Sequence, residues 1–260
     1  MAELTAIRLE RDGPVVHLVL NRPAQFNAIN RQMLEDLDAA CDIVEGDPSI
    51  KVVTLTGEGK AFCAGADLHT VQELSPGPEK WEEFIRLWHR VFNRIEALSV
   101  PVIAGVHGMT LAGGLELTLV ADLVIADEEA RLGDQHANFG LVAGGGGSQR
   151  LPRLIGLRRA KELMLLGHWL SAREALEWGL INRVVLPGQL REGLKQLAGQ
   201  LASLSGSANR TVKMLANRSL DLPLADGLEL EIRAVGEHMQ SADAREGLAA
   251  FIEKRKPKFS

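Results

Sequence analysis

Several features that define other protein classes are scarce in this chain of 260 residues. It has only two cysteines, Cys41 and Cys63, and neither has the C-x-x-C spacing or the nearby histidines of a zinc site. Two cysteines at this spacing do not make a disulfide framework, and their scarcity fits a reducing compartment. We therefore expect no structural zinc, and no residue pattern indicates a metal, nucleotide or redox cofactor.

Excess basic charge and long apolar runs are also lacking. The formal net charge is −5 and the pI is about 5.8, so the overall field does not attract a polyanion such as nucleic acid. No apolar run is long enough to cross a bilayer, and residues 1–13 lack the basic and apolar segments of a secretion signal. We expect a cytoplasmic protein with no nucleic-acid or membrane partner. The densest basic segment, residues 254–258, is either a solvated tail or a contact for one phosphate-bearing molecule.

Hydrophobic periodicity predicts strands that alternate with helices early in the chain and only helices late. The expected strands are residues 5–10 and 15–20, which form a hairpin, and 52–55, 102–106, 122–126 and 180–185. Early helices follow an N-cap at Asn30 and cover residues 78–98, and later ones cover 190–204, 208–220, 225–239 and 242–256. Ser171 and Glu174 form a capping box at the start of a further short helix that Gly179 ends. This pattern indicates an α/β core over residues 1–187 and a helical region over residues 188–260.

Residues 102–116, VIAGVHGMTLAGGLE, combine an apolar strand, a glycine turn and the start of a helix. Amides at a glycine turn can approach a ligand closely, and the helix dipole adds positive charge, so the turn at Gly113 suits an anionic oxygen. Glu116 follows within the first helical turn, and a base beside such a site suits enolate chemistry. Alternatively, the glycines only allow close helix packing and Glu116 is an exposed acid favoured by the dipole.

Several motifs together resemble the crotonase superfamily, also called the enoyl-CoA hydratase/isomerase family. They occur in the family's order along nearly the whole chain: NRP-x-x-x-NA (21–28), AFCAGADL (61–68), PVIAGVHG (101–108), AGGLEL (112–117), GGGGSQRLPRLIG (144–156) and REG-x-x-AFIEKRKPKF (245–259). The resemblance implies an α/β fold with a spiral core of ββα turns and C-terminal helices that mediate trimerisation. It therefore implies a homotrimer or a dimer of trimers.

The resemblance also implies roles for individual residues. The backbone amides of Ala66 and Gly113 would form an oxyanion hole for a thioester oxygen, and Glu116 would act as acid or base. Coenzyme A, present only as part of an acyl-CoA substrate, would be bound by Ala28, Ala64, Ala66, Asp67, Leu68 and His69, with Phe251 and Lys254 completing the site of a neighbouring subunit.

His136 departs from the family pattern, because hydratases commonly have a second catalytic glutamate at this position. Syn addition of water to a 2-enoyl thioester needs one group to activate water and another to protonate the α-carbon. Glu116 suits the first role, and the imidazole of His136 suits the second because it titrates near neutrality. Alternatively, His136 has no catalytic role, or Asp134 compensates for the missing glutamate if the loop bends. Trp81, Phe84 and Trp88 are expected in the core, whereas Phe139 either lines a pocket or fills the core.

We therefore predict an acyl-CoA lyase of the enoyl-CoA hydratase type. Because the second glutamate is missing, the alternative is another reaction on the same scaffold, such as thioester hydrolysis, isomerisation, decarboxylation or retro-aldol cleavage. A different class would be a protein that binds coenzyme A without turnover, or an RNA-binding member of the family. The presence of Glu116 argues against the first, and the acidic net charge argues against the second.

Overall fold

Two β-sheets organise the computed structural model, which describes residues 4–259. The larger sheet has the strand order β1-β2-β3-β5-β7-β10, with bounds Ile7–Asp12, Val15–Leu20, Val52–Gly57, Val102–Val106, Leu123–Asp127 and Arg183–Val185. The smaller sheet has the order β4-β6-β8-β9, with bounds Ala61–Cys63, Met109–Leu111, Arg131–Gly133 and Leu170–Ser171. In the larger sheet β1 and β2 are antiparallel and the other neighbours are parallel, as connections through helices require.

The predicted N-terminal hairpin is confirmed, but its first strand begins two residues later than expected. The amides of Thr5 and Ala6 both donate to the Asp36 carboxylate, at 2.8 and 2.6 Å. Asp36 lies on helix α1 (Arg31–Gly46), so these contacts dock the chain onto a helix before it enters the sheet at Ile7.

Helices α1 and α3 (Pro78–Ala97) pack against each other and share one apolar core with the larger sheet. Helix α1 begins as predicted, because the Asn30 side chain accepts a hydrogen bond from the Met33 amide at 2.9 Å. The core prediction for the aromatic residues of α3 is confirmed for Phe84 and Trp88, which are 0% and 3% exposed, while Trp81 is half-buried. Phe139 is 77% exposed and does not fill the core.

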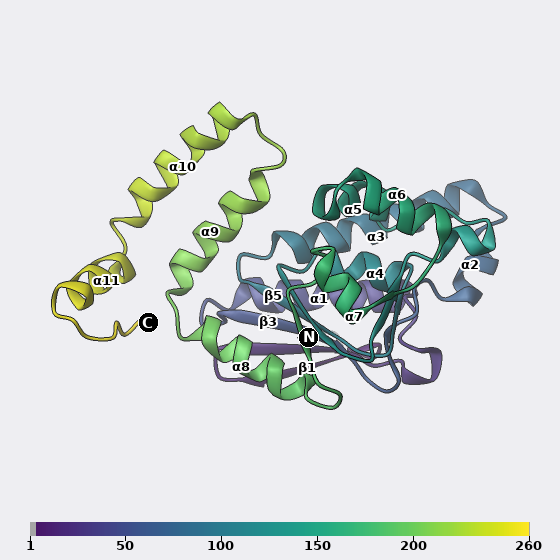
Figure 1. Cartoon of the computed structure of the whole chain (residues 1–260), viewed down its shortest axis with the longest axis horizontal. Helices are drawn as coiled ribbons and strands as arrows, with labels where there is room; N and C mark the ends of the chain where they lie inside the picture. Colours follow the sequence, from purple (N-terminus) through teal and green to yellow (C-terminus); the bar gives the residue numbers. More distant parts are fainter. Residues whose placement is uncertain (1–3, 260) are drawn as a thin grey trace.

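Short helices gather around the smaller sheet and cover one side of the molecule (Figure 1). They are η1 (Pro23–Gln25), α2 (Leu68–Leu74), α4 (Gly113–Thr118), η2 (His136–Phe139), α5 (Gly147–Ile155), α6 (Leu157–Leu166) and α7 (Ala172–Glu177). The glycine run at 144–147 leads directly into α5, and the predicted capping box of Ser171 and Glu174 begins α7.

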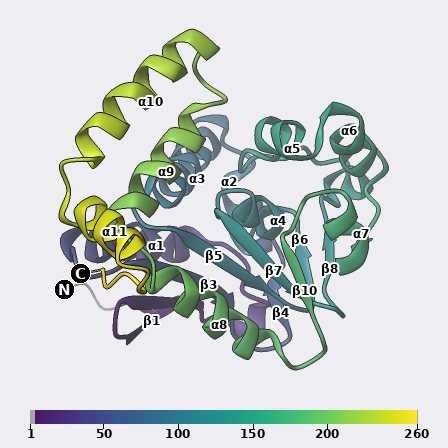
Figure 2. The same cartoon turned by 60° about the vertical axis from the view of Figure 1, so that its left-hand side comes forward.

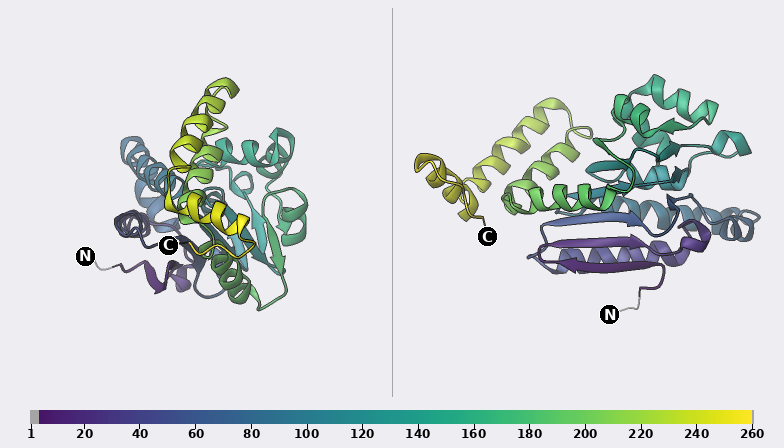
Figure 3. Two further views of the ribbon diagram at one scale, coloured as in Figure 1. Left: turned by 90° about the vertical axis from the view of Figure 1, so that its left-hand side faces the viewer. Right: turned by 60° about the horizontal axis from the view of Figure 1, so that its bottom comes forward.

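The C-terminal residues form four helices, as predicted: α8 (Leu190–Ala202), α9 (Gly206–Arg218), α10 (Leu224–His238) and α11 (Ala242–Ile252). Helix α8 packs Leu194 and Leu197 against the larger sheet, and α9 contacts the α/β body through Lys213, which donates to the Val100 carbonyl and to Asp122. Helices α10 and α11 extend away from that body (Figures 1, 2 and 3). The domain boundary placed after residue 187 stays a prediction. None of the helices within residues 4–259 has the length and apolar character needed to span a bilayer.

Candidate active site

The amides of Ala66 and Gly113 lie in two adjacent loops. Strands β4 and β6 pair in parallel, so the loops that follow them leave the small sheet at the same edge. These loops touch: a Cβ added to Gly65 would lie 3.2 Å from the Gly113 nitrogen. Within residues 4–259 neither amide donates to a protein acceptor, so both are free to bind a developing oxyanion.

Backbone strain sets the direction of the Gly113 amide. Ala112 has φ 49° and ψ −118°, a conformation that L residues rarely adopt. Two hydrogen bonds of 2.9 Å hold it there, because its N–H donates to the Gly133 carbonyl and its own carbonyl accepts from the Glu116 amide. Since ψ of Ala112 orients the next peptide plane, the strain indicates that the orientation of the Gly113 amide matters.

The loop that bears Ala66 is anchored by Asp67. Its carboxylate lies 2.9 Å from the Arg22 guanidinium and caps α2 by accepting from the amides of His69 and Thr70. Arg22 also donates to the Ala28 carbonyl, which ties residues 21–28 to the same loop. Burial opposes ionisation of Asp67, but Arg22 and the two amides outweigh it and lower its pKa.

Glu116 is buried at 2% exposure, so the reading of this residue as an exposed acid is wrong. Its Oε1 accepts hydrogen bonds from the amides of Gly145 and Gly147, both at 2.8 Å, whereas no described residue donates to Oε2. The glycines allow this enclosure, because a Cβ at Gly145 would lie 2.5 Å from Oε2. Burial raises the pKa of Glu116, although the two amides and His136 act in the opposite direction.

His136 follows a bend at Gln135, whose φ is 61°, and this bend turns the ring back onto Asp134. The imidazole Nδ1 lies 3.0 Å from the Asp134 carboxylate, which is buried at 2% exposure. Burial lowers the pKa of His136. Asp134 and the charge of Glu116 raise it by more than burial lowers it, so the pKa lies above the usual value for histidine. With Nδ1 committed to Asp134, Nε2 is the nitrogen left for chemistry.

The remaining predicted residues divide into two groups. Ala28 and Ala64 lie near the Ala66 loop, because the Ala28 carbonyl accepts from Arg22, which also pairs with Asp67, and the Ala64 amide donates to the Phe26 carbonyl. Leu68 and His69 are exposed at the start of α2. Phe251 and Lys254 are exposed at the far end of the C-terminal helices, away from α2 and α4 (Figures 1 and 3). Within one chain, therefore, the C-terminal pair does not join the site.

Sequence reasoning missed three contributors to this site. The glycines at 144–147 stood within a family motif, but their amides were not predicted as donors to Glu116. Arg22 stood within the NRP motif without an assigned partner. Trp88 was assigned only to the core by helical periodicity, although its ring also reaches Gly113 and Gly145.

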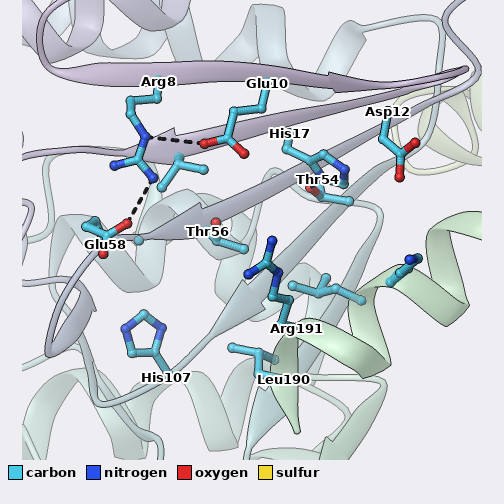
Figure 4. Close-up of a pocket in the computed structure, with 14 residues that line it drawn as sticks. Arg8, Glu10, Asp12, His17, Thr54, Thr56, Glu58, His107, Leu190 and Arg191 are labelled. Atoms are coloured by element: carbon cyan, nitrogen blue, oxygen red, sulfur yellow. Dashed lines mark hydrogen bonds and ion pairs between the residues drawn. The ribbon is translucent and has the colours of Figure 1, made fainter. Parts of the chain in front are cut away.

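A groove of about 620 Å³ lies elsewhere, between the first three strands and α8 (Figure 4). Its lining mixes acidic and basic groups, and Arg8 is already paired with Glu10 and Glu58 at 3.3 and 2.9 Å. It includes neither Glu116 nor His136, so it is separate from the candidate site. No group of three metal-ligating side chains suited to a metal ion occurs in the part of the chain that the structure describes.

Comparison with known proteins gives consistent matches over the whole chain. The family model described as enoyl-CoA hydratase/isomerase matches residues 10–260. The short-chain-enoyl-CoA hydratase of Clostridium acetobutylicum is 37% identical, with 98% of this chain and 97% of the relative covered. The crotonyl-CoA hydratase of Syntrophomonas wolfei is 38% identical, with 97% of each covered. The crystal structure of an enoyl-CoA hydratase from Bacillus anthracis matches with a TM-score of 0.93 and 36% identity, covering 98% of this chain and 99% of that one.

Proposed function

The chain belongs to the enoyl-CoA hydratase/isomerase family, the crotonase superfamily, and on this premise we propose that it hydrates a 2-enoyl-CoA thioester. The crotonase fold that the motifs predicted is confirmed by the matching structure, and the chain is an enzyme of this family with an acyl-CoA substrate. The proposed reaction adds water across the 2,3 double bond, or removes it in reverse.

One observation carries this proposal: a buried carboxylate with one free oxygen lies one helical turn beyond a free backbone amide. The amides of Ala66 and Gly113 would bind the thioester oxygen and stabilise the enolate as negative charge develops. The free Oε2 of Glu116 would accept a proton from water as the water oxygen attacks the β-carbon.

His136 would then supply the second proton, to the α-carbon. Asp134 holds Nδ1 and raises the pKa of the imidazole, so the charged form is favoured and Nε2 carries a transferable proton. At the end of the reaction Glu116 has gained a proton and His136 has lost one, and exchange with solvent restores both.

Thioester hydrolysis is the second candidate. A carboxylate that orients an imidazole is also the arrangement of a general base that activates water. A base must be neutral, however, and the raised pKa of His136 favours the charged form. This ranks hydrolysis behind hydration.

The coenzyme A site is proposed from the family resemblance. Coenzyme A would lie along Ala28, Ala64, Ala66, Asp67, Leu68 and His69.

Helix α10 exposes a stripe of apolar side chains, namely Leu224, Leu228, Ile232 and Val235. A stripe of this kind needs a partner, and we assign it to further copies of this chain in a homotrimer or a dimer of trimers. Such assembly would bring Phe251 and Lys254 to the coenzyme A site of a neighbour.

Mass spectrometry in oxygen-18 water tests the reaction. With crotonyl-CoA, label at the β-carbon means hydration, whereas label only in released carboxylate means hydrolysis and overturns the proposal. The Glu116→Gln variant keeps an oxygen for the two glycine amides but cannot take the proton, so hydration should fall by at least about a hundredfold. Glu128→Gln, at a surface carboxylate paired with Arg173, is the matched control and should retain activity.

A further inference from the structure

Trp88 carries a buried donor that the proposed mechanism leaves unused. The side chain is 3% exposed, and its Nε1 has no hydrogen-bond partner among residues 4–259. Its ring is held between Phe84 and Phe92, with centroid separations of 5.7 and 5.6 Å. Buried donors are nearly always satisfied, so an orphaned N–H on a ring that packing holds in place points to a partner outside the protein chain.

The orphaned N–H lies beside the free oxygen of Glu116. A Cβ added to Gly145 would lie 2.7 Å from Trp88 Nε1 and 2.5 Å from Glu116 Oε2, so the two atoms lie close to one point and therefore near each other. One water molecule can therefore reach both. The same edge of the indole continues past Gly113, since a Cβ there would meet Trp88 Cζ2, the benzo carbon next to the nitrogen side, at 2.6 Å. The indole thus connects the two halves of the candidate site.

We propose that Trp88 positions the reacting water, with Nε1–H donating to a water molecule that in turn donates to Glu116 Oε2. The second lone pair of that water then points away from both groups and is available to attack the β-carbon. Indole nitrogen is a donor only and exchanges no proton in the reaction, so Trp88 orients the water while Glu116 takes its proton. The catalytic meaning of this contact rests on the proposed hydration.

Kinetics of Trp88→Phe separate a water-positioning role from a structural one. Phenylalanine keeps an aromatic ring between Phe84 and Phe92 but removes the donor. Hydration of crotonyl-CoA should fall about tenfold in kcat, the worth of one hydrogen bond, with little change in KM. Exchange of the α-protons of butyryl-CoA in heavy water needs the oxyanion hole and a base but no attacking water. The exchange rate of Trp88→Phe should therefore stay within about twofold of the wild-type rate. Trp178→Phe, on the half-buried tryptophan beside Arg159, is the control and should alter neither rate.

An equal loss of hydration and α-proton exchange would mean that Trp88 only supports the fold, and unchanged hydration would also overturn the proposal. A crystal structure of the unliganded enzyme supplies a readout that needs no turnover. It should show an ordered water within about 3.2 Å of both Trp88 Nε1 and Glu116 Oε2, and Trp88→Phe should lose it. Direct donation from Nε1 to Glu116, or an empty space, would overturn the proposal. If the water is present but the wild type hydrates no enoyl-CoA, the proposed function fails while the water site stands.

Discussion

The glycine run at 144–147 offers a test of how Glu116 is held, because adjacent glycines differ in what they touch. A methyl group at Gly145 would lie 2.5 Å from Glu116 Oε2 and 2.7 Å from Trp88 Nε1, closer than a real Cβ approaches either atom. The same methyl group at Gly144 would meet only the flexible end of Ile85, at 3.2 Å. Neither glycine has a positive φ, so alanine fits the backbone at both positions and only the contacts differ.

We expect Gly145→Ala to push the carboxylate away and to lose at least one of its two amide hydrogen bonds. A hydrogen bond to a charged group is worth about 1.5 to 3 kcal/mol, which corresponds to roughly a tenfold to more than a hundredfold loss in kcat/KM. The kcat/KM of Gly144→Ala should stay within about threefold of the wild-type value, because a small adjustment of the Ile85 side chain costs only about 0.5 kcal/mol. The assay is the disappearance of the enoyl thioester, with a thermal melt to show that both variants are folded. Equal activity of the two variants would refute the assignment of Gly145 to the enclosure of Glu116.

Three further outcomes are expected. Asp134→Asn should lower the pKa of His136, because the carboxylate that raises it is removed. The charged imidazole then loses its proton at a lower pH, so the hydration rate should begin to fall at a lower pH than in the wild type. Lys213→Met should lower the free energy of unfolding by about 3 kcal/mol in urea, because Lys213 is 8% exposed and its ammonium donates to Asp122 at 2.7 Å. Ile232→Asp should disrupt the proposed trimer and give monomers in analytical ultracentrifugation, because it places a charge in the apolar stripe of α10.

Matched variants make each outcome decisive. Asp36→Asn alters another buried carboxylate, far along the chain from His136, and should leave the pH profile unchanged; a profile of Asp134→Asn identical to the wild type would contradict the role given to Asp134. Lys195→Met changes an exposed lysine on α8 and should hardly alter stability, so an equal effect would count against the Lys213 pair. Glu229→Asp, at an exposed acidic position of α10, should leave assembly intact.

Features that depend on neighbours within one or two helical turns could be predicted from the sequence. The Asn30 cap, the Ser171 and Glu174 capping box and the aromatic stripe of α3 are confirmed, because each arises from spacing along a single helix. The start of the first strand was misplaced for the opposite reason. The amides of Thr5 and Ala6 are captured by Asp36, some thirty residues away, and local propensity contains no information about that contact.

The site shows the same division. A glycine turn followed by an acid predicted an oxyanion site with a base beside it, and the family resemblance implied that the amides of Ala66 and Gly113 are its donors. Neither indicated that Glu116 is buried, since its amide donors come from residues 29 and 31 positions later. Asp134 and His136 are close in sequence, yet their contact depends on the left-handed bend at Gln135.

The sequence by itself determined the family, the strands of the larger sheet, the C-terminal helices, and which residues are chemically able to act. It did not indicate the short strands of the smaller sheet. The tertiary structure decided how these residues are arranged: two glycine amides bind one oxygen of Glu116, no described residue donates to the other, and the indole of Trp88 lies beside that second oxygen. The physical reason is that the pKa of a carboxyl and the availability of a hydrogen-bond donor are set by burial and by partners from distant segments. Parallel strands β4 and β6 bring the loops of Ala66 and Gly113 to one edge of the sheet, while the glycine loop before α5 and helix α3 bring the amides and the indole to Glu116.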